Sequence, residues 1–345
     1  MDVWEGNDDE KWDEAQETLR AAGLTDGLPV LPPTARRVET MLAACGVEPD
    51  AAIGVLPPAY AEVTWRDVAI NAVLAGCAPA YLPVVGAAIE AMTAPEFNLL
   101  GIATTTGSAT VCVIVNGPIA SAIGMNSGSN AFGPGNRANA TIGRAVRLTL
   151  QNAGGARAGE IDMATLGQPA KYTFCFAENE SVSPWAPLHA ERGYAPDESV
   201  VTVAGISGTI EIVDSESLTP EDLAQTFAQS MLIAGNVGGA GLLGGSEPLV
   251  VMPPEHAELF ARAGWSKAQA KAAIFERALL PVDRLAPAQR QRAIEGGGAP
   301  DGYLRVAANA GDIMIVVAGG VGRKGAYVPT WSGTTKAVSR KIVAS

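Results

Sequence analysis

Asparagine, serine and arginine side chains gather between residues 126 and 144, in a segment that also carries three closely spaced glycines. The polar loop runs directly into an expected helix, and a helix N-terminus offers unpaired N–H groups and a positive dipole end to an anion. Amide donors in such a loop also suit stabilisation of an oxyanion. The alternative is a structural, asparagine-rich turn before a capped helix. We expect the segment to bind a small anionic substrate through Asn126, Ser127, Asn130, Asn136, Arg137, Asn139 and Arg144.

Further side chains could supply acid–base chemistry near this loop. Lys171 and Glu178 flank one expected strand, where they would act as general acid or base or would simply form surface charge. His189 lies in a proline-bounded loop and could transfer protons, with a structural histidine as the alternative. Arg323 and Lys324 follow a buried strand inside a glycine-rich loop, and the carboxyl ends of strands in α/β sheets commonly hold ligands.

One thiol is a candidate nucleophile. Cys77 stands at the end of an expected helix, just before Pro79. A reactive thiol usually needs a helix N-terminus or a neighbouring cation, so that only a nearby cation could activate Cys77. The alternative is a buried, inert cysteine. We keep Cys77 among the catalytic candidates together with Lys171, Glu178 and His189.

Neither a metal nor a cofactor is expected. The GxGxxG pattern occurs at 239–244 and at 320–325, but in neither place does a helix begin inside the motif, as a dinucleotide site requires. A Walker A sequence is absent. The chain contains two histidines, His189 and His256, and neither HExxH nor paired cysteine spacing. The predicted chemistry therefore proceeds without a nucleotide.

Charge is unevenly distributed along the 345 residues, whose formal net charge is −12. Residues 1–26 hold nine carboxylates against two basic side chains, whereas residues 97–159 hold no carboxylate and four arginines. The negative net charge argues against a nucleic-acid partner, because a protein that binds nucleic acid needs a basic face. The middle of the chain is locally cationic, which favours an anionic ligand there.

The cysteine pattern and the apolar segments indicate the compartment. Four cysteines without a CxxC pair suit a reduced cytosol, and no signal-peptide pattern opens the sequence. The most apolar stretch, 68–94, is interrupted by Asn71, Pro79 and Pro83, so it is too broken for a membrane span. We expect a cytoplasmic protein without a membrane partner.

Expected strands and helices alternate along the chain, with buried strands at 111–115 and 313–318 and a helix at 138–151. This pattern predicts an α/β fold of mixed sheets with helices on both faces. Residues 200–203 and 209–213 look like the two arms of a hairpin. A similarity between residues 30–33 and 251–254 raises the question of two lobes related by an old duplication. The predicted divisions are an acidic helical segment at 1–26 and lobes at 27–195 and 196–345.

Several motifs together resemble a group of uncharacterised bacterial proteins associated with the UGSC-motif (seleno)protein family. They are residues 26–34, 71–77, 116–118, 126–144 and 178–185. The resemblance implies that a cysteine or selenocysteine lies in a separate Rossmann-like portion, carried by a partner. The UGSC signature itself is absent from this chain, which would correspond to the companion portion.

These observations predict an enzyme or catalytic subunit that acts on a small anionic or carbonyl-type substrate by lyase or hydrolase chemistry. One alternative is a thiol-redox component that works with a UGSC-type partner. Another is a non-catalytic assembly subunit. In each case we expect a homo- or hetero-oligomer.

Overall fold

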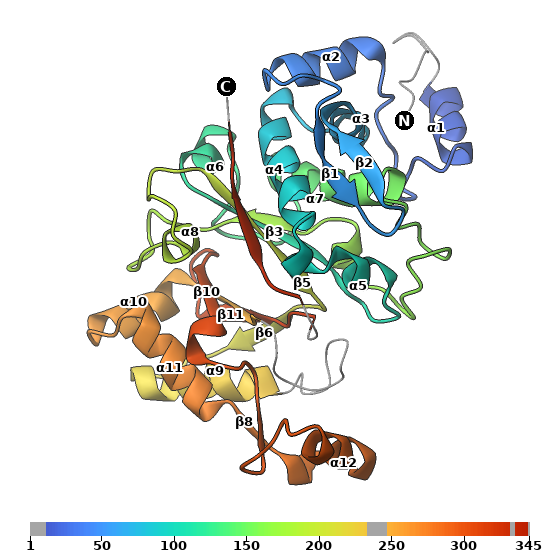
Figure 1. Ribbon diagram of the computed structural model, residues 1–345. Coiled ribbons are helices and arrows are strands. Elements are labelled where there is room, and N and C mark those ends of the chain that lie inside the picture. The colour runs from blue at the N-terminus through green and yellow to red at the C-terminus, as the bar shows by residue number, and fades with distance from the viewer. Residues whose placement is uncertain (1–11, 233–246, 332–334, 344–345) are drawn as a thin grey trace.

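Two four-stranded mixed sheets form the centre of the computed structural model, which describes residues 12–232, 247–331 and 335–343 (Figure 1). The first sheet consists of β3 (Thr110–Asn116), β4 (Cys175–Ala177), β5 (Val200–Ile206) and β12 (Val338–Lys341). The second consists of β6 (Ile210–Val213), β7 (Leu249–Met252), β10 (Met314–Val317) and β11 (Lys324–Val328). The expected α/β class with mixed sheets is confirmed.

The two sheets have the same pattern of parallel and antiparallel strand pairing. The strand order is β12-β5-β3-β4 in the first and β6-β11-β7-β10 in the second. In each sheet the last two strands run parallel and the other neighbours run antiparallel. In this correspondence β7 matches β3. The sequence similarity between residues 30–33 and 251–254 does not reflect this correspondence between the sheets. Residues 30–33 lie in a loop, whereas the start of 251–254 belongs to strand β7.

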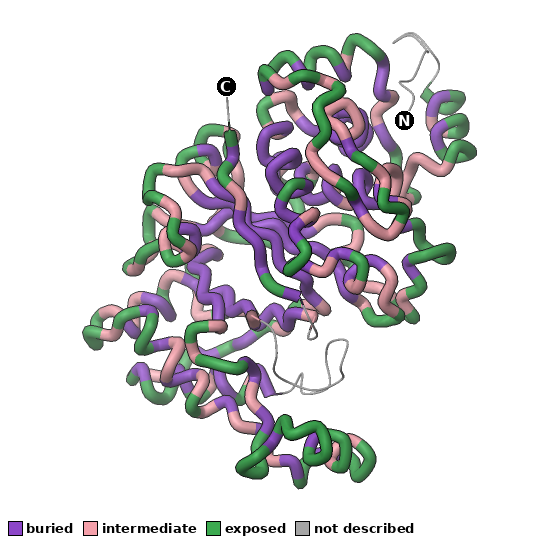
Figure 2. The backbone as a smooth tube through the Cα atoms, viewed as in Figure 1, coloured by how far each residue is buried: buried purple, intermediate pink, exposed green. Residues whose placement is uncertain are grey.

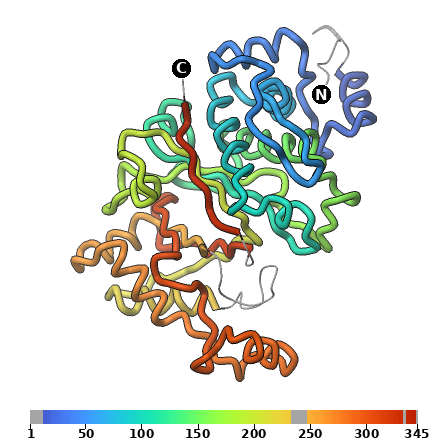
Figure 3. Tube along the Cα trace, viewed as in Figure 1, coloured from blue at the N-terminus to red at the C-terminus, as the bar shows by residue number. Residues whose placement is uncertain are grey.

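The chain crosses between the sheets twice. β5 of the first sheet leads into β6 of the second, and β11 of the second leads back to β12 of the first. Figure 3 shows this return as a red strand among the green segments of the first half. The crossings lie side by side, since Ser207 N–H donates to the Pro329 carbonyl at 2.7 Å and Trp331 N–H to the Gly205 carbonyl at 2.8 Å.

This strand exchange, in which the chain crosses from one sheet to the other and back, corrects two expectations. β5 and β6 lie in different sheets, so that the hairpin predicted from residues 200–213 is wrong. The division expected between residues 195 and 196 does not separate the sheets either, because β5 and β12 both belong to the first. We call the first sheet with its helices the first lobe and the second sheet with its helices the second lobe.

The sheets pack face to face and helices cover their outer faces. Alternate residues such as Ile114 and Val316 meet in the central layer, while Val113 and Val317 point toward the helices. α3 (Trp65–Ala75), α4 (Leu82–Met92) and α7 (Arg137–Asn152) cover the first sheet. α9 (Pro220–Leu232), α10 (Pro254–Arg262) and α11 (Lys267–Arg277) cover the second. Figure 2 shows the buried residues concentrated in these layers.

Smaller elements surround the layers. In the first lobe they are α1 (Trp12–Ala21), α2 (Ala35–Ala43), β1 (Ala52–Leu56), β2 (Ala61–Thr64), α5 (Leu99–Thr104), α6 (Pro118–Ala122) and α8 (Leu188–Glu191). In the second they are β8 (Leu279–Pro281), β9 (Tyr303–Arg305) and α12 (Pro287–Glu295). Short 3-10 turns cover Pro79–Tyr81, Pro95–Phe97, Pro169–Lys171, Val282–Arg284 and Ala310–Asp312. Within the ranges described, no helix has the length and apolar character needed to cross a membrane.

Candidate functional site

Two glycine-rich loops from different lobes meet at the carboxyl end of β10. The loop 126–136 of the first lobe leads into α7, and the loop 318–323 of the second lobe joins β10 to β11. Gly319 N–H donates to the Ser127 carbonyl oxygen at 2.9 Å. A Cβ atom at Gly320 would lie 1.8 Å from Ser129 Oγ and 2.8 Å from Ser129 Cα, so only glycine allows this approach.

A pocket of about 420 Å³ lies at this junction, a size that suits a small molecule. We call it the interlobe pocket. The first lobe contributes residues 129–133, and the second contributes the wall 318–322. Val251 and Ala326, neighbours across β7 and β11, line it with an apolar surface.

Two opposite charges line the interlobe pocket. Lys324 begins β11 and Glu211 lies on β6, with Ala326 directly opposite Glu211 in the antiparallel register. Because side chains alternate along a strand, Lys324, Ala326 and Glu211 share one face of the sheet. Both charged side chains are solvent-exposed. The pocket can therefore offer an ammonium group and a carboxylate to one small ligand.

The asparagines of loop 126–136 mostly build the loop. Asn136 caps α7 by accepting from Asn139 N–H at 3.0 Å, and its own amide donates to the Gly124 carbonyl at 2.8 Å. Asn139 is buried, donates to the Asn126 carbonyl and accepts from the Asn126 N–H. Asn130 adopts φ 63°, donates to the Pro134 carbonyl and also lines the pocket. These contacts match the structural alternative for Asn126, Asn136 and Asn139.

The two arginines expected beside the loop point elsewhere. Arg137 donates to the Gly76 carbonyl at 3.0 Å, at the end of α3. Arg144 forms a bidentate pair with Asp26 at 2.7 and 2.8 Å and also donates to the Pro29 carbonyl. Neither side chain lines the interlobe pocket. The cationic stretch of the sequence is thus partly neutralised by an aspartate from the acidic N-terminal segment.

Two other expected cations differ from Lys324 in their surroundings. Arg323 is held away from the pocket by bonds to the carbonyls of Ser215 and Ser217 at 2.9 and 2.7 Å. Lys171 precedes β4, at the opposite end of that strand from Glu178, and contacts both oxygens of Asp162 at 2.6 and 2.7 Å. Lys171 therefore does not join the interlobe pocket.

Glu178 and His189, by contrast, lie in one buried polar cluster behind the pocket wall. Asn116 donates to Glu178 Oε2 at 2.7 Å and to Glu180 Oε1 at 2.9 Å. His189 is fully buried, with its Nδ1 3.9 Å from Glu180 Oε1. Glu178 also accepts from the Leu188 N–H at 2.8 Å. The cluster thus joins the carboxyl ends of β3 and β4 to α8.

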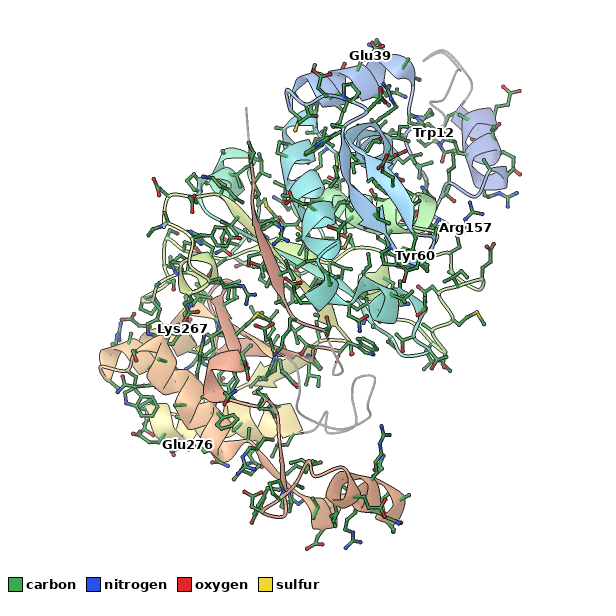
Figure 4. All side chains as sticks on the ribbon, viewed as in Figure 1. Trp12, Glu39, Tyr60, Arg157, Lys267 and Glu276 are labelled. Atoms are coloured by element: carbon green, nitrogen blue, oxygen red, sulfur yellow. The ribbon has the colours of Figure 1, made fainter. Side chains whose placement is uncertain are left out.

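This cluster also holds the end of β10. Val317 N–H lies 3.5 Å from Glu178 Oε1, and Asn179 N–H donates to the Val317 carbonyl at 2.7 Å. Lys267 at the start of α11, labelled in Figure 4, lies 4.0 Å from Glu178 Oε1. Burial raises the pKa of Glu178. Because Gly319 is two residues beyond Val317, the cluster positions one wall of the interlobe pocket.

Cys77 lies apart from both groups and is buried. Its Sγ donates to the Thr141 carbonyl at 3.2 Å, and burial raises its pKa to about 12. Since the thiolate is the reactive form, these surroundings suit the inert alternative.

Sequence reasoning missed Glu211, Phe132 and Thr209, which also line the pocket. Glu211 stands between Ile210 and Ile212, a pattern typical of the solvent face of a strand. Phe132 packs edge-on against Phe176 with ring centroids 4.8 Å apart, so it anchors its loop to the central layer. No signal in the sequence places these residues in one pocket, because their proximity depends on the strand exchange.

The GxGxxG motif at 320–325 leads into β11 and therefore lacks the helix N-terminus that contacts a pyrophosphate. The motif at 239–244 lies outside the described residues. Across the described ranges, no group of three or more histidine, cysteine, aspartate or glutamate side chains is arranged to hold a metal ion.

Comparison with known proteins leaves the family open. No protein-family model matches the chain, and no curated protein matches it. The resemblance to the UGSC-associated group accordingly stays a prediction from the sequence.

Proposed function

We propose that this chain is an enzyme, or a catalytic subunit, that acts on a small carboxylate- or carbonyl-bearing substrate in the interlobe pocket. The reaction would be of lyase or hydrolase type, driven by proton transfer and without a nucleotide. One observation carries the proposal: Lys324 and Glu211 line the same pocket of about 420 Å³ between two glycine-rich loops.

Substrate binding would depend on Lys324. Its ammonium would attract a carboxylate or polarise a carbonyl oxygen, and the Ser129 hydroxyl and Asn130 amide would add neutral donors. Gly320 supports this role because the absence of a side chain lets the backbone there approach a ligand without steric conflict. Val251 and Ala326 would contact the carbon skeleton.

Proton transfer would depend on Glu211. A carboxylate beside the α-carbon of a carbonyl compound can remove a proton, while a nearby ammonium stabilises the negative charge that develops. General acid–base catalysis of this kind contributes about 10²–10⁴ to a rate. Glu178 is not assigned this step, because it is buried, does not line the pocket, and its Oε2 already accepts hydrogen bonds from Asn116 and Leu188.

Binding can be tested before the reaction is known. Calorimetric titration with hydroxy- and keto-carboxylates of two to four carbons should identify a ligand, and Lys324→Met should weaken it about tenfold or more, equivalent to about 1.4 kcal/mol. Lys336→Met is the matched control, because Lys336 is exposed and does not line the pocket. Equal losses in both variants, or no binding by any compound, would contradict the proposal.

Proton abstraction has its own readout. Proton NMR in D₂O should show exchange of the α-hydrogen of a bound keto acid, and Glu211→Gln should remove this exchange while leaving binding intact. Glu216→Gln is the control, as another exposed glutamate that does not line the pocket. Exchange that persists in Glu211→Gln would remove Glu211 from the mechanism.

The thiol-redox alternative gains no support from the surroundings of Cys77. A pKa of about 12 predicts slow alkylation near neutral pH. Rapid reaction of Cys77 with iodoacetamide would reopen that alternative.

A further inference from the structure

We infer that a second pocket, at the amino end of β4, binds an organic anion that carries an apolar tail. This pocket has a volume of about 290 Å³ and lies between α7, the loop 158–168 and the turn that contains Lys171. We call it the cationic pocket. The inference is independent of the function proposed for the interlobe pocket.

The charges around the cationic pocket do not balance. Arg147 and Lys171 both contact Asp162, at 2.7 and 2.6 Å, while Arg144 contacts Asp26. Arg144 does not line the pocket but neutralises Asp26. Arg147 and Lys171 therefore share the single carboxylate of Asp162, and one positive charge is in excess within this network of ion pairs. Asp26, Asp162, Arg147 and Lys171 all line the pocket. All the side chains of these ion pairs are at most 15% exposed, so that water screens this excess less than it would at the surface.

The cations also retain hydrogen-bonding capacity. Lys171 has three N–H donors, and its bonds to Asp162 use two of them. Arg147 has five, and both of its described bonds, to Asp162 and to the Ala156 carbonyl, come from Nη2. A carboxylate entering the pocket could therefore accept hydrogen bonds without displacing Asp162.

Exposed apolar side chains lie on the loop that borders the same pocket. Leu166 lines it and is 93% exposed, while Ile161 and Met163 flank Asp162 and are 43% and 53% exposed. Figure 4 shows this loop on the outer side of the first lobe, near the labelled Arg157. Apolar groups gathered beside buried charge suit a ligand with an anionic head and an apolar tail.

Octanoate is a suitable probe, compared with octanol and octylamine by calorimetric titration of the full chain. We expect octanoate to bind and the other two to bind at least about tenfold more weakly, because each lacks the negative charge. Lys171→Met and Leu166→Ser should each weaken octanoate about tenfold or more. Lys336→Met and Leu218→Ser should not, since both residues are exposed and line neither of the two pockets.

The result separates this site from the interlobe pocket. Lys324→Met should leave octanoate binding unchanged, whereas its loss in that variant would assign octanoate to the interlobe pocket and overturn the inference. Failure of octanoate to bind, equal binding of octylamine, or full affinity in Leu166→Ser would also overturn it. Leu166→Ser remains decisive if Lys171→Met fails to fold, because a side chain that is 93% exposed adds little to folding stability.

Discussion

The backbone N–H of Gly319 donates to the carbonyl oxygen of Ser127 at 2.9 Å, and this bond joins the two lobes at their glycine-rich loops. The two residues are far apart in the sequence and lie on loops of different sheets. Their contact fixes the distance between the walls of the interlobe pocket. The proposed chemistry requires this distance, because one ligand must contact Ser129 and Lys324 together.

Replacing Gly320 with alanine should open the junction. The new Cβ would lie 2.8 Å from Ser129 Cα, and because that atom belongs to the backbone, one loop must move. We expect at least about a tenfold loss of carboxylate affinity and a loss of about 1–3 kcal/mol in the free energy of unfolding. Calorimetric titration and urea unfolding measure the two effects.

Gly311→Ala provides the control for this substitution. A Cβ at Gly311 meets nothing within 4 Å, so both measurements should stay near wild-type values. If Gly320→Ala binds the ligand with full affinity, as the control variant should, the close approach of the loops does not shape the pocket.

Glu178→Ala should destabilise the protein more than Glu178→Gln. Alanine removes the acceptor for the Asn116 amide and the Leu188 N–H, and each buried donor left without a partner costs about 1–3 kcal/mol. Glutamine keeps an acceptor oxygen and nearly the same volume. Urea unfolding should separate the two variants, and equal stabilities would show that the cluster does not hold the ends of β3 and β4.

Asp26 and Arg144 should show strong energetic coupling. Their bidentate pair is largely buried, with side-chain exposures of 6% and 15%, so removing one partner leaves the other poorly solvated. In a double-mutant cycle with Asp26→Asn and Arg144→Met, we expect a coupling free energy of about 1–3 kcal/mol. A value near zero would mean that the pair does not tie the N-terminal segment to α7.

Folding stability should depend on pH through His256. Burial lowers its pKa below the ordinary value of about 6.5, and its Nε2 lies 2.9 Å from the Asp214 carbonyl. Between the lowered pKa and 6.5 the unfolded chain binds a proton that the folded chain does not. The free energy of unfolding therefore decreases as the pH falls through that window.

Urea unfolding of the wild type and of His256→Gln at pH 5 to 8 should reveal this contribution. The stability difference between them should shrink as the pH falls below about 6.5. A ring NMR signal that is absent from His256→Gln should titrate below that pH in the wild type. Titration at or above the ordinary value would contradict the burial argument.

Local patterns predicted individual elements well. The β-branched run at 111–115 lies within β3, and the helix expected at 138–151 lies within α7, where Asn136 provides the cap. Lys324, expected from the sequence to bind substrate, lines the interlobe pocket, and its role there stays a prediction. These outcomes depend on residues close in the chain, where hydrophobic periodicity and capping determine the local structure.

Relationships over long distances in the chain were not predictable in the same way. The hairpin expected from β5 and β6 had suitable strands and a short connection, yet the two strands pair with partners from distant parts of the chain. Arg144 looked like a ligand for an anion because its partner, Asp26, is 118 residues away. Single-sequence patterns do not contain such pairings.

The central claim is that a small carboxylate binds between the two glycine-rich loops. A crystal structure of the full chain with the tightest-binding hydroxy- or keto-carboxylate tests it most directly. We predict ligand density in the interlobe pocket, in contact with Lys324 and Ser129 and beside Glu211. Density for that ligand only at Lys171, or at any place outside the interlobe pocket, would contradict the account.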